Sequence, residues 1–470
     1  MKKNVLLICP HSAIEVFKES KISVVIPHIP YITLASLAAV LLKDGHRVKI
    51  LDLSVSADPY ADLNKTLEIF PPDFAGITFT IGLYQEAMAI AKKIKDYNKN
   101  IKVVAGGAHP SIFPLEIAGE PSFDLAVYGE GENTLSEIVA GHDPAEIKGL
   151  AYKKEDGRVV VNEQRELIKD LDLLPYPAYY LYDPKKYHSP RVTSRKNPVA
   201  AIETSRGCPY NCIFCSKQVF QRVIRFKTPP RVVDEMEILL NLGYREIHIW
   251  DDCFSADLNH AKSVCDEIIK RDLRVCWNIY NGIRVDRVDE ELLVKLKKAG
   301  CYRVSFGVES GDQGVLDRAK KGITIDQIKS AFKLAKKTGM ETLGFFVLGL
   351  PGETKETIEK TINLAKELAV DLPKASIATP LPGTEFFHEW QERRLLNSLT
   401  WSDYVFHTTK RVAQYPGITN EEMTKYYNLF YRRLYLRPSF IWKRVWRGIK
   451  TGDIFFDVYY FLKVFLKFKW

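Results

Sequence analysis

The stretch Arg206-Gly-Cys-Pro-Tyr-Asn-Cys-Ile-Phe-Cys215 places three cysteines, Cys208, Cys212 and Cys215, within eight residues. This C-x3-C-x2-C spacing supplies three thiolates from one short segment. A cubane iron–sulfur cluster takes four ligands, so three protein thiolates leave one iron open to a small molecule. A zinc site or a chance cluster of cysteines is the alternative. Zinc usually needs a fourth protein ligand, often from a second C-x2-C or a histidine pair, and the chain has no such pair.

The residues around the cysteines predict where this segment lies. The apolar run at residues 199–203 is typical of a buried strand. Gly207 and Pro209 flank the first cysteine and interrupt regular structure. We therefore expect the three cysteines on a loop that follows a strand.

This motif and its context resemble the signature of the radical S-adenosylmethionine (SAM) enzymes. The resemblance implies that Cys208, Cys212 and Cys215 hold a [4Fe–4S] cluster, with the methionine moiety of SAM on the open iron. It also implies that an electron from the cluster cleaves SAM to a 5′-deoxyadenosyl radical. Phe214 matches the aromatic position that packs near the adenine.

Length and composition limit the class of protein. A chain of 470 residues, 46% of them hydrophobic, predicts two or three folded domains. No run of 18 uncharged apolar residues occurs, and the N-terminus reads as a strand rather than a signal peptide. Eight cysteines are too few for a disulfide scaffold, and an oxygen-sensitive cluster needs a reducing compartment. We expect a cytoplasmic protein.

Residues 1–140 alternate strand and helix patterns, with predicted strands at 5–8, 48–51, 74–79, 103–105 and 125–127. Strands separated by helices indicate a parallel, Rossmann-like (flavodoxin-like) α/β sheet. Such sheets bind ligands at the carboxyl ends of their strands. Glycines gather at three of these ends, and glycine lets a backbone approach a bulky ligand closely.

The glycine-rich stretches 76–79, 106–110 and 129–132 resemble the cobalamin-binding domain that precedes many radical SAM modules. The D-x-H-x-x-G motif, whose histidine ligates cobalt from below, is absent, as in many members of this branch. A phosphate- or nucleotide-binding domain, or a relic without ligand, is the alternative. The resemblance implies cobalamin contacts from Gly82, Gly106, Gly107, His109, Gly129 and Glu130. His109 could equally cap its loop by hydrogen bonding.

Residues 141–197 contain a predicted hairpin, 150–152 with 159–161, and an extended linker. From 198 to 395 the strand–helix alternation resumes, with later strands expected at 247–250, 275–280, 303–306, 344–349 and 375–378. Six such units resemble the partial (β/α)6 TIM barrel of radical SAM enzymes. Barrel chemistry lies at the carboxyl ends of the strands.

The resemblance implies further SAM contacts at those strand ends. Asp251 and Asp252 match the motif that binds the methionine amino group, and a carboxylate pairs well with an ammonium. Capping of the following turn is the alternative. Glu309 and Ser310 match a polar segment near the ribose or amino end. The loop at Gly349 and Gly352 matches the segment that lies along the adenine, and a purely structural turn is the alternative.

Residues 396–470 form a predicted helical region rich in aromatic and basic side chains. From 421 to 470 there are eleven Lys or Arg against four acids, so much of the net charge of +9 lies here. Such a tail, with Lys463 and Lys467 on one helix face, suits association with a membrane surface, on the inner face of the cytoplasmic membrane. A helical cap packed on the barrel is the alternative, and no nucleic-acid partner is expected.

The whole chain resembles a cobalamin-dependent radical SAM enzyme (class B methylase), of the branch that includes the anaerobic Mg-protoporphyrin cyclase. The resemblance implies hydrogen abstraction from an unactivated carbon, then methyl transfer from methylcobalamin, and an electron donor such as flavodoxin or ferredoxin. The tail favours a lipid or isoprenoid substrate over another small molecule. Cyclisation or oxidation without methyl transfer, and a non-catalytic cobalamin sensor, remain alternatives.

Overall fold

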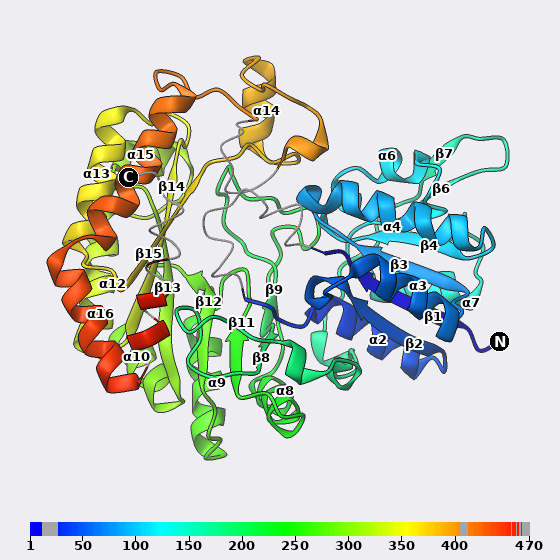
Figure 1. Cartoon of the computed structure of the whole chain (residues 1–470), viewed down its shortest axis with the longest axis horizontal. Coiled ribbons are helices and arrows are strands. Elements are labelled where there is room, and N and C mark those ends of the chain that lie inside the picture. The colour runs from blue at the N-terminus through cyan, green and yellow to red at the C-terminus, as the bar shows by residue number, and fades with distance from the viewer. Residues whose placement is uncertain (12–26, 405–411, 453, 457, 460–461, 463–470) are drawn as a thin grey trace.

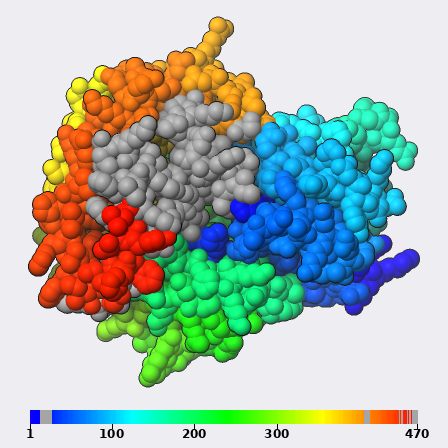
Figure 2. Space-filling view, viewed as in Figure 1, coloured from blue at the N-terminus to red at the C-terminus, as the bar shows by residue number. Residues whose placement is uncertain are grey.

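The computed structural model describes residues 1–11, 27–404, 412–452, 454–456, 458–459 and 462. Two α/β units lie side by side, and the helical C-terminal segment runs along the second of them (Figure 1). In the space-filling view the two units are in contact (Figure 2). The predicted fold class, with a Rossmann-like sheet and a partial barrel, is confirmed.

The N-terminal unit is built on one sheet of seven strands. Its first five strands are parallel, and the predicted hairpin is formed and continues the same sheet by antiparallel pairing with β5. The order across the sheet is β2 (Arg47–Asp52), β1 (Asn4–Cys9), β3 (Phe74–Thr78), β4 (Lys102–Gly106), β5 (Leu125–Val127), β6 (Leu150–Lys153) and β7 (Val159–Val161).

Helices cover both faces of this sheet. Apolar side chains of α3 (Pro59–Ile69), α4 (Tyr84–Tyr97) and α6 (Pro114–Gly119) form the core on one face. Those of α2 (Ile32–Lys43) and α7 (Glu132–Ala140) form the core on the other. The short helix α5 (Ala108–Ile112) follows β4 at its carboxyl end. This two-sided burial explains why the strands read as continuous apolar runs.

The second unit is an open sheet of six parallel strands. Six strand–helix units match the predicted partial barrel, and β9 (Ser205–Arg206) with β10 (Arg225–Phe226) forms a small separate ribbon. The strand order is β15 (Leu372–Ile377), β14 (Glu341–Leu348), β13 (Cys301–Glu309), β12 (Trp277–Ile283), β11 (Glu246–Ile249) and β8 (Val199–Ile202).

The largest hydrophobic core among the described residues lies between the convex face of this sheet and the helices that cover it. Alternate strand residues, such as Ile247, Val304 and Phe346, pack against the surrounding helices. Those helices are α8 (Pro229–Asn241), α9 (Leu258–Lys270), α10 (Glu290–Lys298), α12 (Ile325–Lys337) and α13 (Lys355–Glu367), with α11 (Gln313–Arg318) and α14 (Glu385–Glu392) at the carboxyl ends of β13 and β15. The strand residues that alternate with these core residues point to the concave side of the sheet.

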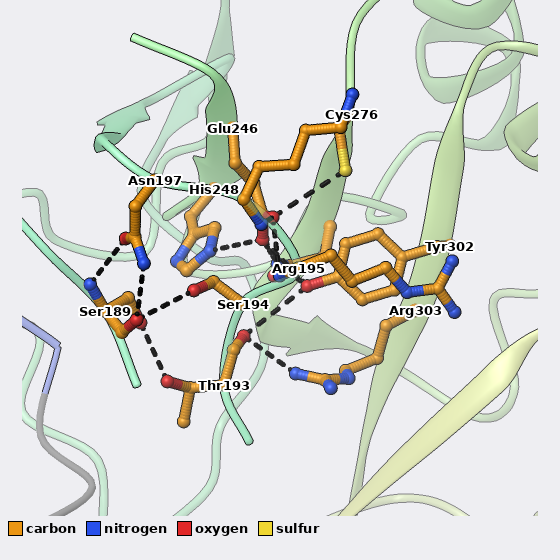
Figure 3. Close-up of polar contacts among 12 residues, drawn as sticks. Ser189, Thr193, Ser194, Arg195, Asn197, Glu246, His248, Cys276, Tyr302 and Arg303 are labelled. Carbon is orange, nitrogen blue, oxygen red and sulfur yellow. Dashed lines mark hydrogen bonds and ion pairs between the residues drawn. The ribbon is translucent and has the colours of Figure 1, made fainter. Parts of the chain in front are cut away.

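A buried polar network closes the amino-terminal end of the barrel (Figure 3). Glu246 accepts hydrogen bonds from the backbone amide of Arg195 at 2.7 Å and from the Tyr302 hydroxyl at 2.7 Å. Arg303 pairs with Glu341 at 2.6 Å and donates to the carbonyl of Thr193 at 2.8 Å. The linker before β8 is therefore the floor of the barrel.

Among the described residues after the barrel are the helices α15 (Asn420–Tyr435) and α16 (Pro438–Thr451). The Tyr431 hydroxyl bonds both the amide and the carbonyl of Ala375, so α15 acts as a cap on the last strand. The predicted helix face with Lys463 and Lys467 lies outside the described residues. Across the part of the chain that is described, no helix is both long and apolar enough to cross a bilayer.

Candidate functional site: the cysteine loop and the facing glycine edge

The three cysteines lie on a loop at the carboxyl end of β8, as predicted. Cys208 is buried, Cys212 is half-buried and Cys215 is exposed, and all three are free thiols. Gly207 has φ +87°, and a Cβ there would lie 2.2 Å from the Val223 carbonyl oxygen, so only glycine fits. The Ile213 amide donates to Ala319 O at 3.1 Å, which ties the loop to the barrel wall.

Cations surround these thiols. Burial raises the pKa of Cys212, and the nearby Lys321 and Arg284 oppose that rise. Burial likewise raises the pKa of Cys215, and Lys217 opposes it. Thiolates are the form that binds metal, so this positive environment suits a cluster held by three of them.

The donor set fits a cubane better than a single ion. Among the described residues, no group of three His, Cys, Asp or Glu side chains converges on one metal position. A cubane does not need such convergence, because each thiolate binds a different iron. Three free thiols on one anchored loop therefore match a site-differentiated cluster.

The two aspartates after β11 have different environments. Asp251 is buried, and its carboxylate accepts hydrogen bonds from the Thr204 amide at 2.6 Å, the Thr204 hydroxyl at 2.5 Å and the Ser205 hydroxyl at 2.7 Å. Burial raises its pKa to about 6. Asp251 thus supports the backbone in front of the cysteine loop. Asp252 is exposed and lies beside Lys217, which leaves it the more accessible carboxylate.

Glu309 and Ser310, at the end of β13, also differ. Glu309 has φ +63°, a strained value for glutamate, and pairs with Lys321 at 2.6 Å. Lys321 in turn lies near Cys212, so this ion pair adjoins the cysteine loop. Ser310 is buried, and its hydroxyl bonds Thr361 at 3.3 Å inside the wall.

The loop after β14 is held by the protein itself. A Cβ at Gly349 would meet the Tyr415 ring at 2.7 Å, and one at Gly352 would meet Arg318 Nε at 2.5 Å. Phe214 packs with Leu350 of this loop and with Ile213 in one apolar cluster. The two glycines are required by turn geometry, whereas Phe214 borders the position expected for the adenine.

We call the carboxyl ends of β4 and β5, which carry Gly106, Gly107 and Gly129, the glycine edge of the N-terminal sheet. This edge has open space beside its backbone. A Cβ built on Gly106 or Gly129 would touch nothing within 4 Å among the residues that the structure describes. Gly107, with φ +99°, is instead packed against Phe79 O at 2.9 Å. Gly82 lies in the short turn 81–83 after β3. Free space along two strand ends fits a large planar cofactor such as a corrin.

His109 lies beneath this edge in an aromatic cluster. The centroid of its ring lies 5.1–5.8 Å from the ring centroids of Phe79, Tyr84, Phe113 and Trp401. Within the described part of the chain neither ring nitrogen has a hydrogen-bond partner, and burial lowers its pKa to about 4. His109 is therefore a neutral, buried ring, and its predicted contact with the corrin stays a prediction.

Glu130 joins the two units. Its buried carboxylate pairs with Arg206 at 3.0 Å and with Arg225 at 2.7 Å, and Arg206 also pairs with Glu132 and Glu203 at 2.7 Å. Arg206 precedes Cys208 by two residues and Glu130 follows Gly129. We call Glu130, Glu132, Glu203, Arg206 and Arg225 the interdomain ion network. It brings the cysteine loop against the glycine edge.

Sequence reasoning missed Lys217, Arg225, Arg284 and Lys321. Each comes to the site from a distant segment or from a loop without a motif, and lysine and arginine are common on any surface. The only available signal was the position of Lys217 two residues after the last cysteine.

Comparison with known proteins agrees with this geometry. Residues 202–365 match the Radical SAM superfamily and residues 24–139 match the B12 binding domain. An uncharacterized methyltransferase of Pyrococcus horikoshii is 36% identical over 438 residues, covering 89% of this chain and 93% of the relative. The anaerobic magnesium-protoporphyrin IX monomethyl ester cyclase of Rubrivivax gelatinosus is 30% identical, covering 86% and 74%.

A solved structure shares the fold. It is the radical SAM methyltransferase TsrM from Kitasatospora setae with cobalamin and [4Fe-4S] cluster bound, at a TM-score of 0.68 and 24% identity, covering 84% of this chain and 78% of that one. Together with the cysteine loop and the glycine edge, these findings establish the predicted cofactors. The chain therefore belongs to the cobalamin-dependent radical SAM methyltransferase family, whose cofactors are a [4Fe–4S] cluster, SAM and cobalamin.

Proposed function

We propose that this enzyme transfers a methyl group to an unactivated carbon of a small molecule or lipid. The observation that carries the proposal is the interdomain ion network. Through Arg206 and Glu130, 3.0 Å apart, it joins the loop for the cluster to the edge for cobalamin. A substrate carbon must meet both cofactors in turn, so the two edges have to share one chamber.

The residues of this chain hold and orient the cluster, SAM and cobalamin. The three thiolates bind the cluster, and Lys217, Arg284 and Lys321 compensate its negative charge. Asp252 and Glu309 are the carboxylates near the cysteines that suit a methionine ammonium, and Phe214 suits the adenine face. Gly106 and Gly129 admit the corrin. When bound, the cofactors supply one electron, an adenosyl radical and a methyl group.

The test is an isotope experiment on the anaerobically reconstituted enzyme. We incubate it with reductant, host-cell extract and SAM whose methyl group is fully deuterated, and follow products by mass spectrometry. A methyltransferase gives 5′-deoxyadenosine and a product carrying the deuterated methyl. A product that loses hydrogen without gaining label favours cyclisation or oxidation, which the cyclase relative makes the second candidate. Absence of both 5′-deoxyadenosine and any labelled or oxidised product would leave the non-catalytic sensor.

The reaction also needs a one-electron donor. Flavodoxin or ferredoxin is the class we propose, because the reduced cluster must be regenerated for each turnover. Replacing dithionite by reduced flavodoxin in the same assay tests this assignment.

We further propose that α16 binds a membrane surface and gives access to a lipid substrate. Trp442, Trp446 and Ile449 follow an i, i+4, i+7 spacing and so share one helix face. They are 71%, 54% and 58% exposed. Lys443 and Arg444 lie on the same helix, and tryptophan beside cations suits the headgroup region of anionic lipid.

Replacing Trp442 and Trp446 by alanine should lower binding to phosphatidylglycerol vesicles by about a hundredfold. Burying each aromatic side chain contributes roughly 1.5–3 kcal/mol. The matched control replaces Leu173 and Tyr180, which are 74% and 62% exposed outside α16, and should bind like wild type. Cosedimentation is the measurement. Equal binding of wild type and the tryptophan double variant would refute membrane association through α16.

A further inference from the structure

The concave face of the barrel sheet carries a row of residues that have no role in the binding of the cofactors described above. In parallel strands, directly paired residues point to the same side. Gly307 pairs with Phe345, and Phe345 pairs with Lys374. Their neighbours Phe306, Phe346 and Ala375 belong to the convex core. Phe345 and Lys374 therefore face the interior of the barrel.

Two glycines of the concave face lie close to side chains of this row. A Cβ built on Gly282 of β12 would lie 3.8 Å from Phe345 Cε2, so the ring reaches across the face toward that strand. A Cβ on Gly307 would meet the Glu309 carboxylate at 2.7 Å and Lys321 Nζ at 2.8 Å. Since Lys321 lies near Cys212, this row of the barrel lies next to the cysteine loop.

The opposite wall is also aromatic. His248 and Trp250 stack on Tyr280, with ring centroids 5.3 and 6.0 Å apart. Trp250 is 37% exposed, and Tyr280 and Phe345 are half-buried, although all three belong to the concave face. Solvent therefore reaches apolar ring surface inside the barrel, which suits the body of an organic substrate.

Lys374 is a cation of the concave face that has no acidic partner among the described residues. The nearby acids already have partners. Glu341 pairs with Arg303 at 2.6 Å, and Glu309 pairs with Lys321 at 2.6 Å. Glu246 accepts hydrogen bonds from the Arg195 amide and the Tyr302 hydroxyl at the amino-terminal end of the barrel (Figure 3). Within the described ranges no carboxylate lies within 4.0 Å of Lys374 Nζ, which instead stands 5.7 Å from the Phe345 centroid. A half-buried lysine without an acidic partner is suited to bind the anionic group of a ligand.

We propose that the substrate is an amphipathic molecule with an anionic group, carboxylate or phosphate. Lys374 binds the anion, and the apolar body lies on Phe345, Tyr280 and Trp250. The inference rests on the proposed function in taking the barrel interior as the reaction chamber. It concerns binding, which is measured separately from methyl transfer.

The test uses two dyes of nearly the same shape, anionic 1-anilinonaphthalene-8-sulfonate and uncharged N-phenyl-1-naphthylamine. Each is dialysed to equilibrium against anaerobic holoenzyme that carries Trp442→Ala and Trp446→Ala, which removes exposed aromatic surface of α16. Lys374→Met should weaken binding of the anionic dye about tenfold to a hundredfold, the range for a charge-assisted contact. It should change binding of the neutral dye by less than about twofold.

Three further variants complete the design. Lys374→Arg should keep most of the affinity for the anion, Trp250→Leu should weaken both dyes, and Lys336→Met on the exposed face of α12 should change neither. Equal effects of Lys374→Met on both dyes, or none on either, would overturn the proposal. So would an equal loss of SAM affinity, which would assign Lys374 to the cosubstrate. If Lys374→Met selectively lost affinity for the anionic dye but the enzyme transferred no methyl group, the anion site would stand and only the proposed function would be refuted.

Discussion

Replacing Cys212 by alanine is expected to reduce 5′-deoxyadenosine formation at least roughly a thousandfold, because removing one member of a catalytic unit costs nearly as much as removing all. Two thiolates cannot hold the cluster as three do, so iron content should fall as well. The measurement is iron and sulfide analysis beside SAM cleavage under reducing conditions.

The matched control for Cys212 is Cys265→Ala. Cys265 is a buried free thiol on α9, within the convex core and outside the loop. Its replacement removes one sulfur from the same protein and should leave the cluster and SAM cleavage intact. If both variants lost the cluster equally, the effect would come from folding, and the assignment of Cys212 as a ligand would lose its support.

Arg206→Leu is expected to destabilise the protein by about 3–5 kcal/mol, the usual cost of removing one partner of a buried ion pair. It would leave Glu130, Glu132 and Glu203 facing one another, with Arg225 as the remaining cation of the network. Arg206→Lys keeps the charge but not the planar fork, so an intermediate loss should result. Denaturant unfolding gives the free energies.

A second measurement separates positioning from stability. If the network aligns the two cofactor edges, Arg206→Lys should raise the ratio of 5′-deoxyadenosine to methylated product at temperatures where the variant is folded. Lys92→Met, which breaks the exposed pair with Asp96, is the control and should change stability by less than about 1 kcal/mol. An Arg206→Leu protein as stable as this control would contradict a structural role for the network.

The strands and the cysteine loop were predictable because their signals are local. Strands buried on both faces read as apolar runs, and the C-x3-C-x2-C spacing lies within ten residues of chain. Both units of the fold followed from these patterns, and so did the hairpin. Its pairing with β5, which extends the N-terminal sheet, had no local signal.

What could not be predicted depends on partners far away in the sequence. Glu130 was expected near cobalamin, but Arg206 lies 76 residues further on and binds its carboxylate. Asp251 was expected at SAM, and Thr204 and Ser205 occupy its oxygens. Lys374 was overlooked for a different reason. The last strand was predicted to begin at residue 375, and β15 begins at Leu372, which puts the lysine on the concave face.

The most direct measurement is metal analysis and SAM cleavage on anaerobically purified protein, wild type beside the variant with alanine at Cys208, Cys212 and Cys215. The wild type should contain equal amounts of iron and acid-labile sulfide and form 5′-deoxyadenosine after reduction, whereas the variant should contain no cluster and form no 5′-deoxyadenosine. Zinc bound by the wild type at these thiols, or undiminished 5′-deoxyadenosine from the triple variant, would contradict the assignment of these cysteines to a cluster.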